Sequence, residues 1–110
     1  MVSDVIAIVE PFVQRGVFKS PEAAVAEMAR DYTLRQIERY RMIDDNFRAK
    51  FGMDYEQFDA YLKARSAMLT SQPSSALNQA VMAEEEDAFD WKVARDMLSN
   101  WLGIQVKVGV

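Results

Sequence analysis

Glycine and proline are so rare in this chain that only a few long secondary-structure elements can account for its length. Its 110 residues include four glycines and three prolines, and these two residue types most often interrupt helices and strands. Alanine, glutamate, arginine, methionine and leucine are frequent, and all five favour helices. The length suits one domain with a modest core. We therefore predict an all-α protein of four helices.

One interruption lies in the stretch QRGVFKSPEAA, residues 14–24. Gly16 suits the left-handed residue that follows a helix, and Val17 then occupies the position at which a Schellman motif makes its apolar contact. Ser20 can accept a hydrogen bond from the first turn of the next helix, where Pro21 has no amide to leave unpaired. The stretch therefore predicts a helix–helix corner that is capped on both sides.

The first helix is predicted to run from Ser3 to Arg15, although Pro11 lies within it. Proline removes a backbone hydrogen bond and crowds the carbonyl four residues earlier. Either the helix is kinked there, or VIAIVE is extended and a short helix begins at Pro11. We favour the kinked helix because the helical spacing of apolar residues continues across the proline. These residues are Val5, Ile6, Val9, Phe12 and Val13.

The second helix is predicted to be long, from Pro21 to Phe51. Its main apolar stripe consists of Val25, Ala29, Tyr32, Tyr40, Ile43, Phe47 and Phe51. Leu34 and Ile37 lie off this stripe, and a helix of roughly 45 Å is longer than so small a domain covers by itself. We therefore expect a homodimer, or a higher homo-oligomer, formed through the first two helices. The residues that we assign to this dimerisation contact are Val9, Phe12, Val25, Tyr32, Leu34 and Ile37.

A third helix is predicted to begin at Asp54, because Asp54 and Gln57 are spaced as in a capping box. It ends before the polar segment SQPSS, residues 71–75. We interpret this segment as a hinge between a dimerisation region at residues 1–70 and a C-terminal region at residues 76–110.

A fourth helix is predicted from about Ser75 to Leu102, with Gly103 as its cap. The acidic run EEED, residues 84–87, can fray or break it. The tail IQVKVGV alternates like a short strand, and one strand is not stable alone. The tail would therefore pair with a partner, pack loosely or be disordered.

The chain contains no cysteine and no histidine. Disulfides and thiolate nucleophiles are thereby excluded, and the commonest general base and transition-metal ligand is missing. No nucleophile–base set and no glycine-rich phosphate loop is recognisable. The acidic run invites a metal site, but consecutive carboxylates point around a helix instead of converging. We expect no catalytic activity, no metal and no cofactor.

Charge and hydropathy narrow the classes of partner. The net charge of −4 argues against a dedicated nucleic-acid binder. The charges of the second helix also come mostly as local pairs, such as Asp31 with Arg35 and Asp44 with Arg48, four residues apart. The longest apolar run, VIAIV, is far shorter than a membrane span, and the N-terminal residues show no export signal. We expect a soluble cytoplasmic protein.

The fourth helix carries a large apolar patch next to the acidic run, formed by Trp91, Trp101, Phe89, Met97 and Leu98. Tryptophan is enriched at the centres of protein interfaces, so this patch would anchor a partner in a complex, whereas it would be core in a monomer. Both interpretations are open. The residues that we assign to the partner surface are Glu84, Glu85, Asp87, Trp91, Leu98 and Trp101.

The stretch VIAIVEPFVQRGVFKSPEAAVAEMAR resembles the helix–turn–helix half of small prokaryotic antitoxins of the ribbon-helix-helix type and their strandless helical relatives. The matching positions are Val13, Gly16, Phe18, Ser20, Glu22 and Val25. The resemblance covers about residues 3–45. Little of the chain precedes the first helix, so DNA-reading strands are not carried over. The resemblance implies a dimeric helical core and a C-terminal segment that binds a toxin-like protein. A scaffold homo-oligomer without a separate partner is the alternative.

Overall fold

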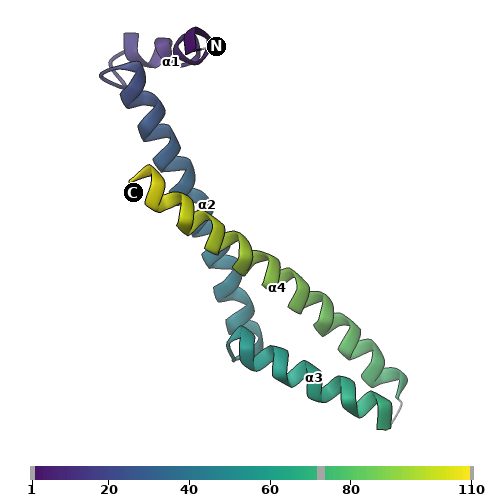
Figure 1. Cartoon of the computed structure of the whole chain (residues 1–110). Helices are drawn as coiled ribbons and strands as arrows, with labels where there is room; N and C mark the ends of the chain where they lie inside the picture. Colours follow the sequence, from purple (N-terminus) through teal and green to yellow (C-terminus); the bar gives the residue numbers. More distant parts are fainter. Residues whose placement is uncertain (1, 72–73, 110) are drawn as a thin grey trace. The chain divides into compact units, whose positions relative to one another are not determined.

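The computed structural model describes residues 2–71 and 74–109, and these residues form four helices and no strand (Figure 1). The helices are α1 (Val2–Gln14), α2 (Pro21–Phe51), α3 (Tyr55–Ser71) and α4 (Ser75–Val108). The prediction of an all-α fold of four helices with a long second helix is therefore confirmed.

Helix α1 continues through Pro11, so the alternative in which VIAIVE is extended is wrong. The proline costs the helix one hydrogen bond, and the following turns retain theirs. Gly16 adopts a φ of 76° after the helix, and its N–H donates to the Val13 carbonyl at 3.0 Å. The N–H of Val17 donates to the Phe12 carbonyl at 2.9 Å. These two bonds form the predicted Schellman motif.

The starts of α2 and α3 are capped by the predicted side chains. The Ser20 hydroxyl accepts a hydrogen bond of 3.1 Å from the Ala23 N–H. The Asp54 N–H donates to Oε1 of Gln57 at 2.9 Å, and the Gln57 N–H donates to Oδ1 of Asp54 at 2.8 Å. This reciprocal pair is the predicted capping box, and it satisfies amides that would otherwise be left unpaired.

Helix α4 begins next to the predicted hinge and continues through the acidic run at residues 84–87. The Ser74 hydroxyl accepts a hydrogen bond of 3.3 Å from the Leu77 N–H at its first turn. Within SQPSS, Ser71 ends α3 and Ser75 begins α4, while residues 72–73 lie outside the described part of the chain. The acidic run therefore neither ends nor restarts the helix.

The predicted end of the fourth helix at Leu102 is wrong, because α4 passes through Gly103. Residues 104–108, which we considered for a strand, are helical in this single chain. A glycine inside a helix costs roughly 1 kcal/mol relative to alanine, which tertiary contacts can offset. One such contact joins the last turn to α2, where Nε of Arg30 donates to the Val108 carbonyl at 3.3 Å.

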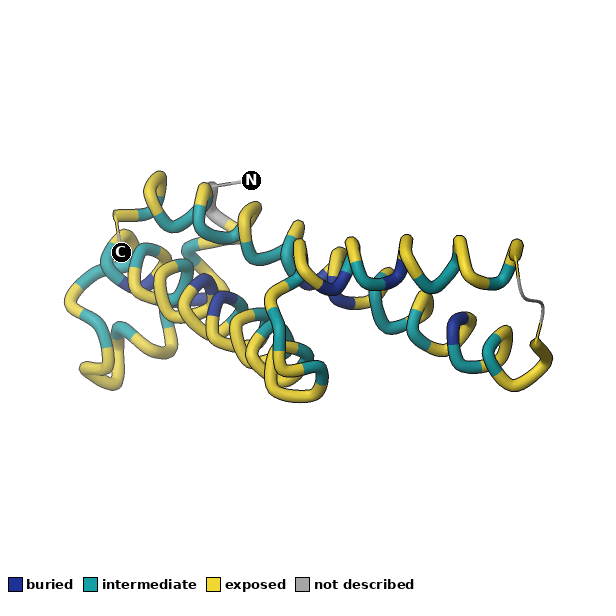
Figure 2. Tube along the Cα trace, turned by 90° about the horizontal axis from the view of Figure 1, so that it is seen from below, coloured by how far each residue is buried: buried dark blue, intermediate teal, exposed yellow. Residues whose placement is uncertain are grey.

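The described chain divides into two compact units. The terminal unit consists of the residues up to Ile37 together with those from Trp101 onward, and the central unit is Glu38–Asn100. Helices α2 and α4 contribute to both units. Figure 2 shows that buried residues are few in either unit and that exposed residues recur along every helix.

In the terminal unit, the buried side of α2 is not the predicted stripe. Ala24, Thr33 and Ile37 are buried, whereas Val25 and Tyr32 of the stripe are exposed. The Thr33 hydroxyl donates to a backbone carbonyl one turn earlier at 2.7 Å, which satisfies its buried polar group. The side of α2 that carries Ala24, Thr33 and Ile37 is thus the covered side, and two large stripe residues face outward.

In the central unit, the last two residues of the predicted stripe do lie against the core. Phe58 and Trp91 are fully buried, and Phe47 and Phe51 pack against them. The ring centroids of Phe51 and Phe58 are 4.0 Å apart, and those of Phe47 and Trp91 are 5.6 Å apart. Aromatic side chains of this size dominate core energetics, so α2, α3 and α4 are held together here.

Candidate protein-binding surfaces

Helix α4 is apolar on two opposite sides within the central unit. Val81, Trp91 and Ala94 are buried and lie on one side of the helix. Met82, Phe89 and Val93 lie on the other side, at spacings of seven and four residues that bring their side chains onto one face. Only the first side belongs to the core. The second side, which we call the α4 stripe, is an apolar face without cover.

The exposure of the α4 stripe is large. The exposed fractions are 61% for Met82, 68% for Phe89 and 42% for Val93. Single exposed apolar residues are ordinary on protein surfaces, but a set on one helix face indicates an interaction surface. The sequence analysis missed Met82 and Val93. Their helical spacing with Phe89 was the signal in the sequence that could have identified them.

Trp91, which we had assigned to the partner surface, is buried in the core of the central unit. Its indole Nε1–H donates a hydrogen bond of 2.7 Å to Oδ1 of Asp44. Phe47, Tyr55 and Phe58 surround the indole with centroid distances of 5.5–5.6 Å. A side chain that is fully covered by its own chain does not contact a partner, so we remove Trp91 from that surface.

The acidic residues of the predicted partner surface are held by their own chain. Oε1 of Glu84 is buried and lies 3.0 Å from Nη1 of Arg65, in an ion pair without hydrogen-bond alignment. Asp87 pairs with Lys50 at 2.6 Å. Glu85 accepts a long hydrogen bond of 3.4 Å from the Ser66 hydroxyl.

The other two predicted partner residues, Leu98 and Trp101, are half-buried. The Trp101 ring meets the Tyr32 ring edge-on, with centroids 5.7 Å apart. Its Nε1 is buried without a hydrogen-bond partner among the described residues. Trp101 therefore contributes to packing inside the terminal unit.

The terminal unit has an exposed apolar surface of its own. Val5, Ile8 and Phe12 share one face of α1, and Val25 of α2 lies across from Val5; all four are 42–70% exposed. We call these four residues the N-terminal apolar surface. The tilted rings of Phe12 and Phe18, 6.2 Å apart, continue it toward the corner between the helices.

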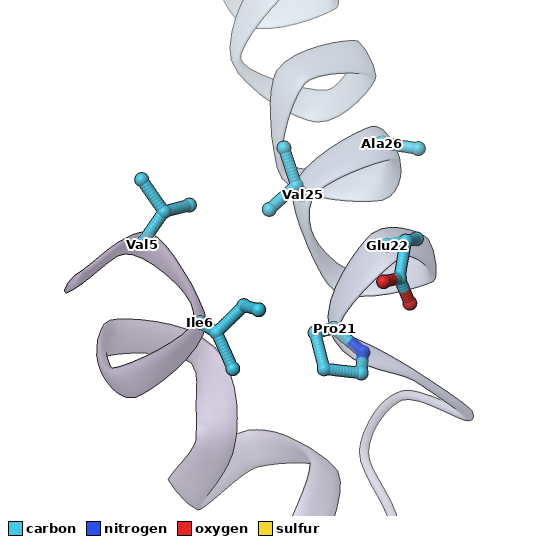
Figure 3. A pocket seen from close by; sticks show the side chains of 6 residues that line it. All are labelled: Val5, Ile6, Pro21, Glu22, Val25 and Ala26. Carbon is cyan, nitrogen blue, oxygen red and sulfur yellow. The ribbon is translucent and has the colours of Figure 1, made fainter. Parts of the chain in front are cut away.

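A pocket of about 350 Å³ adjoins this surface. It is lined by Val5, Ile6, Pro21, Glu22, Val25 and Ala26. Figure 3 shows the side chains of Val5 and Ile6 from α1 on one side of the space and those of Pro21 and Val25 from α2 on the other. An apolar groove between two helices suits a side chain of a further helix better than a polar ligand.

The six residues that we assigned to dimerisation divide into two groups. Val9 and Ile37 are buried inside the chain. Phe12, Val25, Tyr32 and Leu34 are exposed, although Tyr32 also contacts the ring of Trp101. The exposed group is available to a second copy. The N-terminal apolar surface extends it with Val5 and Ile8, which were not among the assigned residues.

Three groups among the described residues have shifted pKa values, and each shift moves the pKa away from neutrality. A hydrogen bond from its own backbone, and then Arg95, lowers the pKa of Glu56. The hydrogen bond to Asp59 raises the pKa of Lys63, and the hydrogen bond to the Tyr61 hydroxyl raises the pKa of Arg65. These three side chains therefore keep their charges at neutral pH.

The predicted charge pairs on α2 are confirmed. Arg35 and Asp31 lie 2.9 Å apart, and Arg48 and Asp44 lie 3.2 Å apart.

Within the described ranges, no helix is long and apolar enough to span a membrane, and no three acidic side chains gather as metal ligands would.

No family model, no curated protein and no solved structure matches this chain.

Proposed function

We propose that this chain is a non-enzymatic, cytoplasmic protein-binding regulator of the antitoxin kind. Two copies associate through α1 and α2, and α4 binds a partner protein. One observation carries the proposal: in both units, a set of large apolar side chains on one helix face stays exposed. Such faces mark interaction sites on proteins in water, because burying them against another polypeptide is favourable.

The proposed dimer contact is the N-terminal apolar surface with its adjoining pocket. In a two-fold dimer the same patch serves on both copies, so α1 of each copy would lie against the pocket of the other. Ile8 and Phe12 would then fill space next to Val25 of the second copy. Each contact occurs twice in such a dimer, so one substitution removes two contacts.

Sedimentation at micromolar concentrations tests self-association. We expect the wild-type chain to sediment as a dimer, and Ile8→Glu to raise the dimer dissociation constant by at least about a hundredfold, because two buried isoleucines are lost. Met68→Glu is the matched control, since Met68 is exposed on α3 and lies outside this surface. A monomeric wild-type chain, or equal effects of the two substitutions, would contradict the proposed contact.

Site-specific photocrosslinking tests partner binding. A photoreactive amino acid is placed at Phe89 of the α4 stripe, or at Met68 as a control, in the cells that produce the protein. We expect one adduct of defined mass from position 89 and none from position 68. A chain that is monomeric in sedimentation and forms no adduct at position 89 would refute the regulator proposal as a whole.

A scaffold homo-oligomer is the second candidate, and the burial of Trp91 favours it. This tryptophan, one of two in α4, is covered by its own chain, which also accepts the hydrogen bond of its indole, so it needs no partner. For a scaffold, Phe89 would crosslink to a second copy of this chain, which an adduct of twice the chain mass identifies.

A further inference from the structure

The α4 stripe has a charge pattern that narrows the kind of partner it suits. Glu86 lies within the stripe, between Met82 and Phe89, and Asp96 follows Val93 by three residues. Both carboxylates are exposed, and neither has an ion-pair partner among the described residues. An apolar face is therefore combined with uncompensated negative charge.

The carboxylates on the buried side of α4 do have ion-pair partners. There Glu84 pairs with Arg65 and Asp87 pairs with Lys50, so intrachain cations neutralise both. On the exposed side, within the described part of α4, Lys92 is the cation nearest to the stripe, and it lies at one border only. The carboxylates of α4 thus include a neutralised inner pair, Glu84 and Asp87, and an outer pair, Glu86 and Asp96, that faces solvent.

We propose that the α4 stripe binds a basic amphipathic helix of a partner protein. Apolar residues one turn apart on that helix would pack against Met82, Phe89 and Val93, as in helix-in-groove recognition. Lysines or arginines beside them would pair with Glu86 and Asp96. This inference rests on the proposed function, because it names the chemistry of the partner that α4 binds.

The same pattern disfavours other occupants. A second copy of this chain would bring the same carboxylates together, and like charges at an interface oppose binding. Nucleic acid is polyanionic and would be repelled for the same reason. In the proposed complex the apolar contact supplies most of the affinity, while charge complementarity directs the approach and the register.

A designed peptide probes the proposal directly. The probe is a fluorescently labelled helix of about five turns with leucines along one face and lysines on both flanks. Two matched peptides keep the leucines and replace every lysine by glutamine or by glutamate. Fluorescence anisotropy with the full chain measures binding at low and at high salt. We expect the lysine peptide to bind, the glutamine peptide to bind roughly tenfold more weakly, and the glutamate peptide not to bind.

Charge-reversal variants locate the contact. Glu86→Lys together with Asp96→Lys should weaken binding of the lysine peptide roughly tenfold, since two rim ion pairs contribute up to about fivefold each. Glu38→Lys together with Asp45→Lys changes the net charge equally on exposed positions of α2 and should have little effect. Circular dichroism checks that both variants remain helical.

An apolar variant separates the stripe from the rest of the surface. Phe89→Ser should abolish binding of the lysine peptide, whereas Met68→Ser on α3 should leave it unchanged. Equal binding of the lysine and glutamine peptides, equal effects of the two charge reversals, or binding that survives Phe89→Ser would each overturn the inference. A change in sedimentation of the peptide-free protein on Phe89→Ser would assign the stripe to a second copy and overturn it as well.

The crosslinking and peptide experiments together distinguish a partner of other chemistry from the absence of any partner. If position 89 crosslinks to a partner in cells but the lysine peptide shows no advantage, α4 binds a protein of other chemistry. If position 89 forms no adduct and the lysine peptide does not bind, partner binding by α4 itself is refuted.

Discussion

The indole of Trp91 on α4 donates a hydrogen bond of 2.7 Å to the carboxylate of Asp44 on α2, across 47 positions of sequence. The donor belongs to the largest fully buried side chain, and the acceptor is mostly buried as well. A buried indole N–H needs an acceptor, because leaving it unpaired costs the full penalty of desolvation. Together with the rings packed around the indole, this bond holds one side of α4 against the core and leaves the α4 stripe exposed.

Asp44→Ala should lower the free energy of unfolding by about 1–3 kcal/mol, since it leaves the Trp91 N–H unpaired. Asp44→Asn keeps a carbonyl acceptor and should lose less. Asp45→Ala, one position along on the exposed side of α2, is the matched control. Urea unfolding followed by circular dichroism measures all three, and equal losses for the two alanine variants would contradict the role of Asp44.

Substitution by phenylalanine should cost more stability at Trp91 than at Trp101. Trp91→Phe removes the bond to Asp44 and opens space in the core, so we expect a loss of at least about 2 kcal/mol. Trp101→Phe removes an N–H that has no partner among the described residues and keeps an aromatic ring next to Tyr32. Its cost should stay below about 1 kcal/mol. Similar losses in urea unfolding would show that the bond to Asp44 contributes little.

Substitution by alanine should lower the free energy of unfolding at Gly16 and raise it at Gly103. Gly16 has a φ of 76°, a conformation that costs an L-residue about 1–2 kcal/mol, so Gly16→Ala should destabilise by that amount. Gly103 lies inside α4, and an added methyl group would meet no atom within 4 Å. Gly103→Ala should therefore stabilise by about 0.5–1 kcal/mol. Thermal unfolding measures both, and destabilisation by Gly103→Ala would mean that α4 ends at Leu102.

The lowered pKa of Glu56 has more than one cause. The largest single cause is a hydrogen bond from its own backbone, followed by the hydrogen bond from Arg95, whose Nη1 lies 2.8 Å from Oε1. Arg95→Ala should raise the pKa of Glu56 only in part, whereas Lys92→Ala should leave it in place. A carboxyl-detected NMR titration reads the pKa directly, and a full return to the ordinary value would assign the whole effect to Arg95.

The lowered pKa of Glu56 determines how this side chain affects stability at different pH values. A carboxyl whose pKa is lower in the folded state stabilises the fold above its unfolded pKa, and this contribution is lost as pH falls through the lowered value. Unfolding experiments on Glu56→Gln should therefore show a weaker loss of stability on acidification than the wild type. An unchanged acid profile would show that Glu56 contributes nothing measurable.

The helix boundaries that depend on nearby residues were predictable from the sequence. Gly16, Ser20 and the pair Asp54 and Gln57 act through hydrogen bonds that span at most five residues, so the sequence contains everything that determines them. Gly103 was misjudged because its local preference for a helix end is weak. Contacts far along the chain, such as Arg30 with the Val108 carbonyl, are invisible to such a pattern.

The binding surfaces were harder to predict than the helices. Periodicity showed that α4 has apolar residues around much of its circumference, but not which side the chain itself covers. Trp91 was predicted to anchor a partner protein, but Asp44 and the surrounding rings enclose it within its own chain. Likewise, Ile37 lay off the main stripe of α2 and is nevertheless buried. Burial depends on tertiary neighbours, and a single sequence does not identify them.

The division of the chain into units gives a truncation after Asn100 a defined consequence. All residues of the central unit, Glu38–Asn100, would remain, while the terminal unit would lose the helical turns from Trp101 onward. Tyr32 would then lose its ring contact with Trp101, and Arg30 would lose its hydrogen bond to the Val108 carbonyl. Apolar surface exposed in this way promotes aggregation, although most of the sequence is still present.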